Sequence, residues 1–81
     1  MKVLDQIAEC VPDAMLADGL DDAVLGHDTK GRVVYSVERA VGIFMERDGM
    51  DLETAREHFD FNVEQAYVGE MTPLYIYTYD A

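Results

Sequence analysis

The sequence predicts a single α+β domain, in which a small three-stranded antiparallel-type sheet is packed by two to three helices in the order α-β-β-α-α-β. Three observations support this fold class. The chain has only 81 residues, two segments of its second half carry apolar stripes at helical spacing, and its last segment alternates with period two. A chain of this length holds one core, so we expect one domain over residues 1–81.

The N-terminal part predicts a helix followed by a hairpin. Apolar residues at helical spacing predict a short amphipathic helix over residues 3–10, which Pro12 ends. Residues 12–19 fit either a further helical turn or an irregular crossing. Apolar runs at 23–25 and 33–35 flank residues that favour a tight turn, so we expect a β-hairpin there.

The C-terminal part predicts two helices and a strand. Ser36 and Asp51 are candidate N-caps, Asp48-Gly49 ends the first helix, and Gly69 is a candidate left-handed residue at the end of the second. Residues 74–79 alternate and are rich in aromatic and β-branched side chains, which predicts a strand that joins the hairpin. The expected core-facing stripes are Val37, Ala40, Val41, Phe44 and Met45, and Leu52, Ala55, Phe59, Val63, Ala66 and Tyr67.

The composition narrows the class of partner. Seventeen Asp and Glu residues stand against six Lys and Arg residues, which gives a net charge of -11. This charge repels nucleic acid and anionic membranes, so we expect no direct nucleic-acid or membrane binding and a basic protein or complex that handles nucleic acid as partner. The lone Cys10 excludes an intramolecular disulfide, and the absence of signal-peptide and membrane-spanning patterns predicts a cytoplasmic protein.

Candidate catalytic and metal-binding residues are few. Cys10 is expected to be partly buried and inert, and His27 and His58 lack the spacing of a metal site. The acidic cluster of Asp18, Asp21, Asp22 and Asp28 lacks the alternating ligands and final Glu of an EF-hand loop, and the glycines are scattered. The sequence therefore predicts no catalytic residue, no metal site, no cofactor and no enzyme activity.

Asn62 lies at the edge of the second apolar stripe. A buried amide must be hydrogen-bonded, so we expect it to tie the helix to the loop at residues 70–72. A polar contact at a binding surface is the alternative.

An acidic row is the first candidate partner-binding feature. Glu53, Glu57, Asp60 and Glu64 recur every three or four residues, so on one helix they would form a stripe with steps of about 4.5 to 6 Å, similar to phosphate spacing. The alternative is a solvated face, and Arg56 would soften its field. High acidity with little Lys is also typical of halophilic proteins, in which charge serves solubility.

A row of tyrosines on the last predicted strand is the second candidate partner-binding feature. Tyr75, Tyr77 and Tyr79 alternate onto one face of the last strand, while Leu74, Ile76 and Thr78 take the other. If the helices cover the leucine and isoleucine face, the tyrosines form an open surface for a partner or for a homodimer through this strand. If both faces are covered, the tyrosines are packing residues.

The strings RDGM at 47–50, FDFN at 59–62 and AYVGEMTP at 66–73 resemble a family of small proteins of unassigned function encoded by phages and bacteria. The resemblance covers about residues 33–74 and marks a fold rather than a reaction. It implies a phage or prophage setting, in which small acidic proteins often inhibit host defence enzymes by direct binding.

Taken together, these features predict a non-enzymatic inhibitor of a nucleic-acid-handling host defence complex, an anti-CRISPR-like protein that could mimic nucleic acid in the host cytoplasm. One alternative is a housekeeping protein-interaction module whose acidity is adaptive. The second alternative is a small metal-dependent enzyme.

Overall fold

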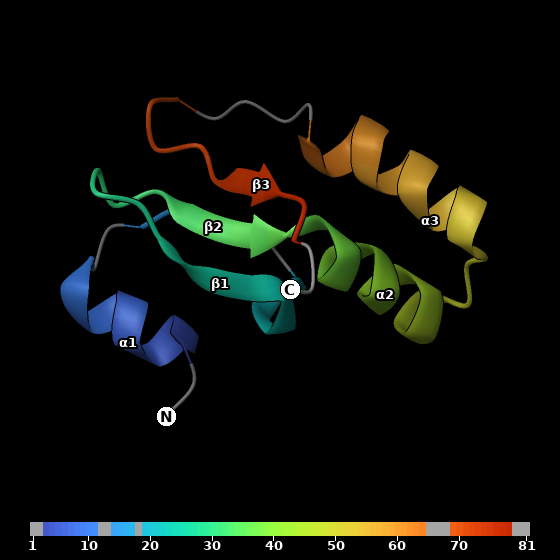
Figure 1. The fold of residues 1–81 in the computed structure, drawn as a ribbon, viewed down its shortest axis with the longest axis horizontal. Coiled ribbons are helices and arrows are strands. Elements are labelled where there is room, and N and C mark those ends of the chain that lie inside the picture. The colour runs from blue at the N-terminus through green and yellow to red at the C-terminus, as the bar shows by residue number, and fades with distance from the viewer. Residues whose placement is uncertain (1–2, 12–13, 18, 65–68, 79–81) are drawn as a thin grey trace.

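The fold is that of a computed structural model, which describes residues 3–11, 14–17, 19–64 and 69–78 (Figure 1). It is an α+β fold, as the sequence predicts. In chain order the elements are α1 (Val3–Cys10), a 3-10 turn (Asp21–Ala23), β1 (Val24–His27), β2 (Val33–Ser36), α2 (Val37–Asp48), α3 (Leu52–Phe59), a π-helical turn (Asp60–Glu64) and β3 (Leu74–Ile76).

The sheet has the strand order β1-β2-β3 and is mixed. β1 and β2 form the expected antiparallel hairpin, in which Val24 lies opposite Tyr35 and the register shifts at a bulge before Gly26. β3 pairs with β2 in parallel, with Val34 opposite Leu74. The prediction of an antiparallel-type sheet is therefore wrong for β3.

The parallel pairing follows from how the two helices connect β2 to β3. α2 begins directly after β2 and leads the chain away from the sheet, and α3 packs beside α2 and brings the chain back (Figure 1). The chain then enters β3 from the end at which β2 begins, so the two strands run in the same direction. Parallel neighbours require a long crossover of this kind, whereas a tight turn joins antiparallel strands.

The predicted caps set both ends of α2 and the start of α3. The Ser36 hydroxyl accepts a hydrogen bond from the Arg39 N–H at 3.3 Å, and Gly49 ends α2 in the left-handed conformation with φ 69°. The Asp51 carboxylate accepts a hydrogen bond from the Thr54 N–H at 2.8 Å at the start of α3. These bonds satisfy N–H groups that the first turn of a helix leaves without a partner.

The core lies between the sheet and the helices. Val33 and Tyr35 are completely buried in β2, and the Tyr35 hydroxyl accepts a hydrogen bond from the Ala17 N–H at 2.8 Å, so this buried phenol is satisfied. Among the described residues, the core cluster comprises Ile7, Leu20, Ala23, Val24, Val33, Tyr35, Val37, Ala40, Val41, Phe44, Ala55 and Phe59.

Several local predictions differ from the structure. Met45 and Leu52, which were assigned to the buried stripes, are 37% and 47% exposed. Residues 14–17, for which a helical turn and an irregular crossing were both open, are not helical. The regular part of the long C-terminal helix ends at Phe59 and a π-helical turn continues to Glu64, while residues 65–68, before the predicted end at Gly69, lie outside the described residues. Ala66 and Tyr67 lie outside the described residues.

Candidate interaction surface

The outer side of α3 carries the first part of the predicted acidic row. Glu53, Glu57 and Asp60 are exposed, and within the described part of the chain their carboxylates form no ion pair or hydrogen bond. The backbone of Glu64 belongs to the π-helical turn, but its side chain is outside the description. Three of the four predicted acidic residues are therefore placed on one exposed surface.

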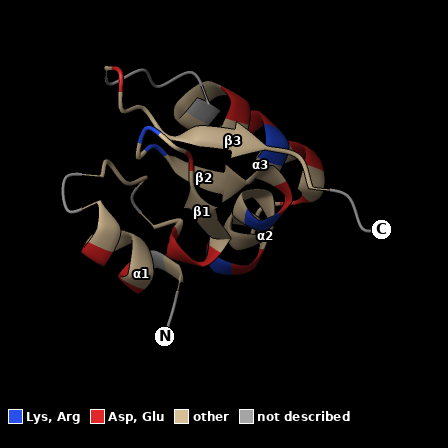
Figure 2. Cartoon of the chain, turned by 60° about the vertical axis from the view of Figure 1, so that its left-hand side comes forward, with Lys and Arg blue, Asp and Glu red and all other residues tan. Residues whose placement is uncertain are grey.

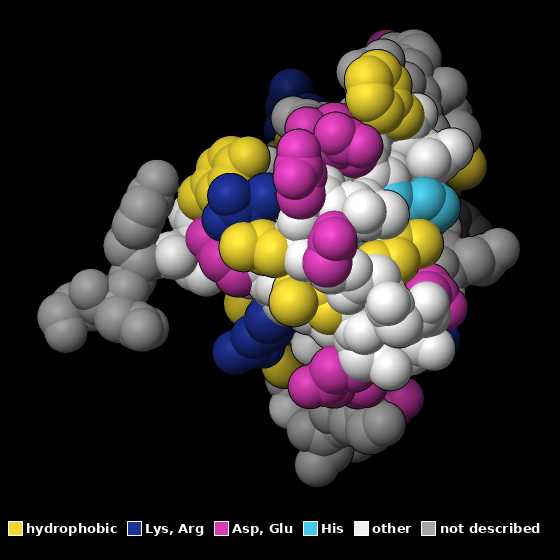
Figure 3. Space-filling model, turned by 90° about the vertical axis from the view of Figure 1, so that its right-hand side faces the viewer, with side chains coloured by type: hydrophobic (Ala, Val, Ile, Leu, Met, Phe, Trp, Pro, Cys, Tyr) yellow, Lys and Arg dark blue, Asp and Glu magenta, His cyan; other side chains and the backbone are white. Residues whose placement is uncertain are grey.

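The row is not a straight stripe on one regular helix. From Asp60 the chain forms a π-helical turn, in which hydrogen bonds span five residues and each turn is wider. The regular spacing on which phosphate mimicry depends thus holds for Glu53, Glu57 and Asp60 and does not extend to Glu64. Figure 3, which faces the α2 and α3 end, shows acidic side chains in separate groups among apolar and basic ones.

The π-helical turn presents an aromatic side chain that sequence reasoning missed. Phe61 is 72% exposed and follows Glu57 by four residues. The available signal was that Phe61 falls outside the apolar stripe, which passes through Phe59 and Val63. An exposed aromatic ring beside carboxylates is typical of a protein-binding surface, because it adds apolar contact area.

Asn62 supports this turn and does not reach the loop at residues 70–72. Its side-chain N–H donates to the His58 carbonyl oxygen at 3.2 Å and lies 3.2 Å from His58 Nδ1. The expected tie to the loop is therefore wrong. The amide instead bonds the carbonyl four residues back, where the helix changes to the wider turn.

Tyr75 packs between the sheet and α3. Its ring stacks on Tyr35 with centroids 5.5 Å apart and meets the Phe59 ring edge-on at 5.3 Å. Burial raises the pKa of the Tyr75 phenol, and Tyr35 adds to the rise. The packing alternative thus describes Tyr75, and the helices lie on its face of β3.

The other tyrosines differ. Tyr77 is 61% exposed and, with Arg56 and Asp60, borders a hollow of about 170 Å³ whose lining includes Phe59. Ile76, on the opposite face of β3 from Tyr75, is 43% exposed. Tyr79 lies outside the described residues. The structure therefore places Tyr77 alone of the described tyrosines of this segment as a surface aromatic beside the acidic residue Asp60.

A carboxylate fixes the chain after β3. Glu38, in the first turn of α2, accepts hydrogen bonds from the Thr78 N–H at 3.0 and 3.1 Å, from the Thr78 hydroxyl at 3.1 Å and from the Ser36 hydroxyl at 3.2 Å. The bond from the Thr78 backbone is the main reason that the pKa of Glu38 is lowered. Glu38 thereby holds the segment that carries Tyr77 against the start of α2.

Of the candidate catalytic residues, Cys10 and His27 border one hollow of about 360 Å³, whereas His58 lies elsewhere, against Phe44. Cys10 is exposed, which corrects the expectation of partial burial. His27 donates from Nδ1 to the Asp28 carbonyl oxygen at 2.8 Å, and the His58 ring meets the edge of the Phe44 ring with centroids 4.6 Å apart. Within the described residues no group of three or more His, Cys, Asp or Glu side chains could hold a metal ion.

The structure describes three of the four residues of the predicted acidic cluster. Asp21 and Asp22 are exposed in the 3-10 turn, whereas Asp28 organises the hairpin turn. Asp18 is outside the described residues. Elsewhere in the described residues, Asp and Glu occur on α1, α2 and α3 (Figure 2). Lys and Arg occur on the turn between β1 and β2 and on α2 and α3.

Comparison with protein-family models, curated proteins and solved structures gives no match. In the described part of the chain, no helix has the length and apolar character needed to span a membrane.

Proposed function

We propose that this protein is a non-enzymatic inhibitor that binds a basic, nucleic-acid-handling complex of a bacterial defence system through the outer side of α3. The observation that carries the proposal is the set of carboxylates of Glu53, Glu57 and Asp60, which have no partner among the described residues, on a chain of net charge -11. Phe61 and Tyr77 extend this surface with exposed aromatic rings. The anti-CRISPR-like role in a host cytoplasm and the phage or prophage origin are part of the same proposal.

Charge and aromatic contacts have distinct tasks in this proposal. Carboxylates attract a cationic channel and speed encounter, but rim charges add little to affinity on their own. Aromatic residues at the centre of an interface supply most of the binding energy. Phe61 is therefore the expected anchor, and Glu53, Glu57 and Asp60 orient the protein on its basic partner.

The distribution of acidic residues favours a second candidate function. Exposed Asp and Glu also lie on α1 and α2, among them Asp5, Glu9 and Glu46. A general acidic coat of this kind supports the housekeeping interaction module whose acidity serves solubility. The two functions differ in whether the position of the charge matters.

The experiment compares two variants with the same change in net charge. One carries Glu53→Gln, Glu57→Gln and Asp60→Asn on α3, and the other carries Asp5→Asn, Glu9→Gln and Asp21→Asn on α1 and the 3-10 turn. Each is expressed in bacteria with defined CRISPR–Cas or restriction systems, and phage plating efficiency is measured. The parent protein should protect the phage in at least one defence background.

In that background, the α3 variant should lose protection and the second variant should retain it. Direct binding of the parent to the purified complex should weaken steeply with salt, and DNA should compete. Equal loss in both variants would favour the adaptive-acidity candidate. Absence of protection in every background tested would count against the inhibitor function as a whole.

A further inference from the structure

A groove separate from the acidic α3 surface is lined by two basic residues, Lys30 and Arg32. It has a volume of about 630 Å³, which lies within the range of small-molecule sites. It is formed by the turn between β1 and β2 and by the chain that enters β3. Its lining comprises Lys30, Arg32, Gly69, Glu70, Met71, Thr72, Pro73 and Leu74.

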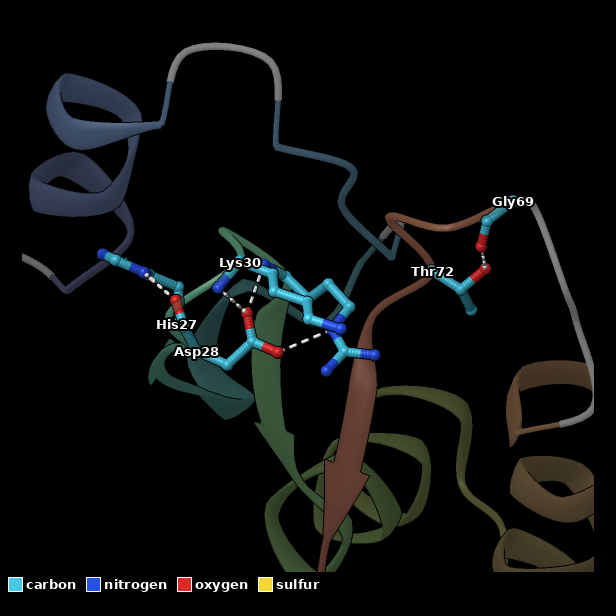
Figure 4. Close-up of polar contacts among 6 residues, drawn as sticks. His27, Asp28, Lys30, Gly69 and Thr72 are labelled. Carbon is cyan, nitrogen blue, oxygen red and sulfur yellow. Dashed lines mark hydrogen bonds and ion pairs between the residues drawn. The ribbon is translucent and has the colours of Figure 1, made fainter.

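Asp28 orients the arginine of this groove. One carboxylate oxygen accepts hydrogen bonds from the Lys30 and Arg32 N–H groups, both at 2.9 Å, and the other accepts from Arg32 Nε at 2.6 Å. Figure 4 shows Asp28 and Lys30 on the turn between β1 and β2, and Gly69 and Thr72 on the chain that enters β3. Desolvation raises the pKa of Asp28, but the hydrogen bonds from Arg32 and Lys30 outweigh it and lower the pKa.

This contact leaves the far end of the guanidinium available. Arg32 is held through Nε, and its two terminal nitrogens form no hydrogen bond within the described residues. Those nitrogens present the fork that binds phosphate or carboxylate oxygens in pairs. Because Asp28 already fixes the side chain, less conformational freedom is lost when an anion binds.

The two turns are packed against each other through Gly31. This residue is buried with φ 88°, and a Cβ atom built there would lie 3.0 Å from Val11 and 3.3 Å from Met71. The positive φ favours glycine, and an added Cβ would require the Val11 and Met71 side chains to shift. The spacing between the cationic turn and the 69–74 segment is therefore set by packing.

The local charge of the groove differs from that of the whole chain. Lys30 and Arg32 line it together with Glu70, and Asp28 is paired with Arg32, so these four groups sum to no net charge, against -11 for the whole chain. At physiological salt, charges more than about 8 Å away are largely screened, so these groups dominate the field felt by a ligand. Met71, Pro73 and Leu74 add an apolar wall beside the two cations.

We propose that this groove binds a small phosphate-bearing molecule with an apolar or aromatic body, whose phosphate contacts Arg32 and Lys30. Two cations match a phosphate monoester, which carries about -1.5 to -2 charges near neutral pH, better than a single carboxylate. The apolar wall contacts the body of the ligand. This site is separate from the α3 surface, so it does not depend on the inhibitor function.

The test is a titration of the full chain, followed by backbone amide NMR shifts, with three probes. Phenyl phosphate carries both parts of the ligand, inorganic phosphate lacks the body, and benzoate replaces the phosphate by a carboxylate. Phenyl phosphate should cause saturable shifts confined to residues 28–32 and 69–74 and should bind more tightly than either other probe. Inorganic phosphate as tight as phenyl phosphate would overturn the apolar body, and benzoate as tight would overturn the preference for phosphate.

Four variants locate the site. Arg32→Lys keeps the positive charge but loses the two terminal guanidinium nitrogens, and it should weaken phenyl phosphate binding roughly tenfold, as expected for a lost charge-assisted pair. Lys30→Gln removes a positive charge and leaves the bond between Arg32 and Asp28 in place, and it should also weaken binding. Glu70→Gln should strengthen it. Arg39→Gln, on α2 outside the groove, changes net charge as Lys30→Gln does and should have little effect.

Equal weakening by Arg39→Gln and Lys30→Gln would reduce the effect to overall charge and overturn the site. The same conclusion would follow if phenyl phosphate gave no saturable shifts at millimolar concentration. Chemical shifts of core amides such as Val33 report whether each variant remains folded, so loss of binding and loss of structure are distinguished.

Discussion

Replacing Tyr75 with serine tests whether this residue of β3 packs in the core or forms a binding surface, and we expect a large loss of unfolding free energy. Truncation of a fully buried aromatic side chain costs about 3–5 kcal/mol. Tyr75 is only partly buried, which reduces this to about 2 kcal/mol, and its contacts with Tyr35 and Phe59 bring the expected loss to about 2–3 kcal/mol. A domain of this size has a total unfolding free energy of roughly 4–12 kcal/mol.

Such a loss should be visible in thermal unfolding followed by circular dichroism. For a domain of this length it corresponds to a fall in Tm of about 10–20 °C. The matched replacement is Tyr77→Ser, which removes a ring that is 61% exposed and should cost about 1 kcal/mol or less. If Tyr75→Ser left Tm unchanged, the assignment of Tyr75 to the core would be refuted. If Tyr77→Ser lowered Tm as much as Tyr75→Ser, the exposed position of Tyr77 would be refuted.

Tyr75→Phe provides a control that keeps the ring. Because burial raises the pKa of the Tyr75 phenol above its usual 10.0, the folded state holds this proton more tightly than the unfolded state. The resulting stability is present below pH 10.0 and is lost as the pH rises through the folded-state pKa. Tyr75→Phe should therefore lose less stability in this alkaline range than the parent.

Two further replacements test the contacts that position the surfaces. Gly31→Ala should destabilise the fold by about 1–2 kcal/mol, because it adds a Cβ at positive φ against Val11 and Met71; a Tm equal to that of the parent would contradict the tight packing of the two turns. Glu38→Gln should flatten the dependence of Tm on pH in acid. The lowered pKa of Glu38 gives stability that is present above pH 4.5 and lost as the pH falls through its folded-state value. Glu46→Gln, on the same helix, is the control, since the Glu46 carboxylate forms no hydrogen bond within the described residues; identical pH profiles for both variants would exclude the Glu38 contact.

The sequence predicts local elements well because their signals are local. The bounds of α1 and the caps at Ser36, Gly49 and Asp51 match the structure, since each rests on residues within one or two turns. The direction of β3 could not be predicted in this way. It depends on how α2 and α3 route the chain between strands, which is a property of the whole crossover.

The candidate site was predictable only in part for the same reason. Periodicity places Glu53, Glu57 and Asp60 on one surface, but the π-helical turn changes the spacing beyond Asp60 and presents Phe61 as an exposed ring. Alternation assigns Tyr75 and Tyr77 to one face without saying how far the helical cover extends. Tyr75 packs on Phe59 of α3, whereas Tyr77 borders the hollow beside Arg56 and is 61% exposed, so two residues with the same pattern have different surroundings.

Tyr75 also connects the two proposed surfaces, and this affects how loss of binding is interpreted. Its ring contacts Phe59, the last residue of α3, which carries the acidic surface. Tyr75 also follows Leu74, the first residue of β3, which lines the groove with Lys30 and Arg32. Loosening Tyr75 should therefore weaken both a basic partner at α3 and a phosphate probe at Arg32, although Tyr75 touches neither. Surface replacements should act on one site only: Glu57→Gln on the partner and Lys30→Gln on the probe. Loss of both activities together indicates a damaged core, and only separate losses identify residues that contact a ligand.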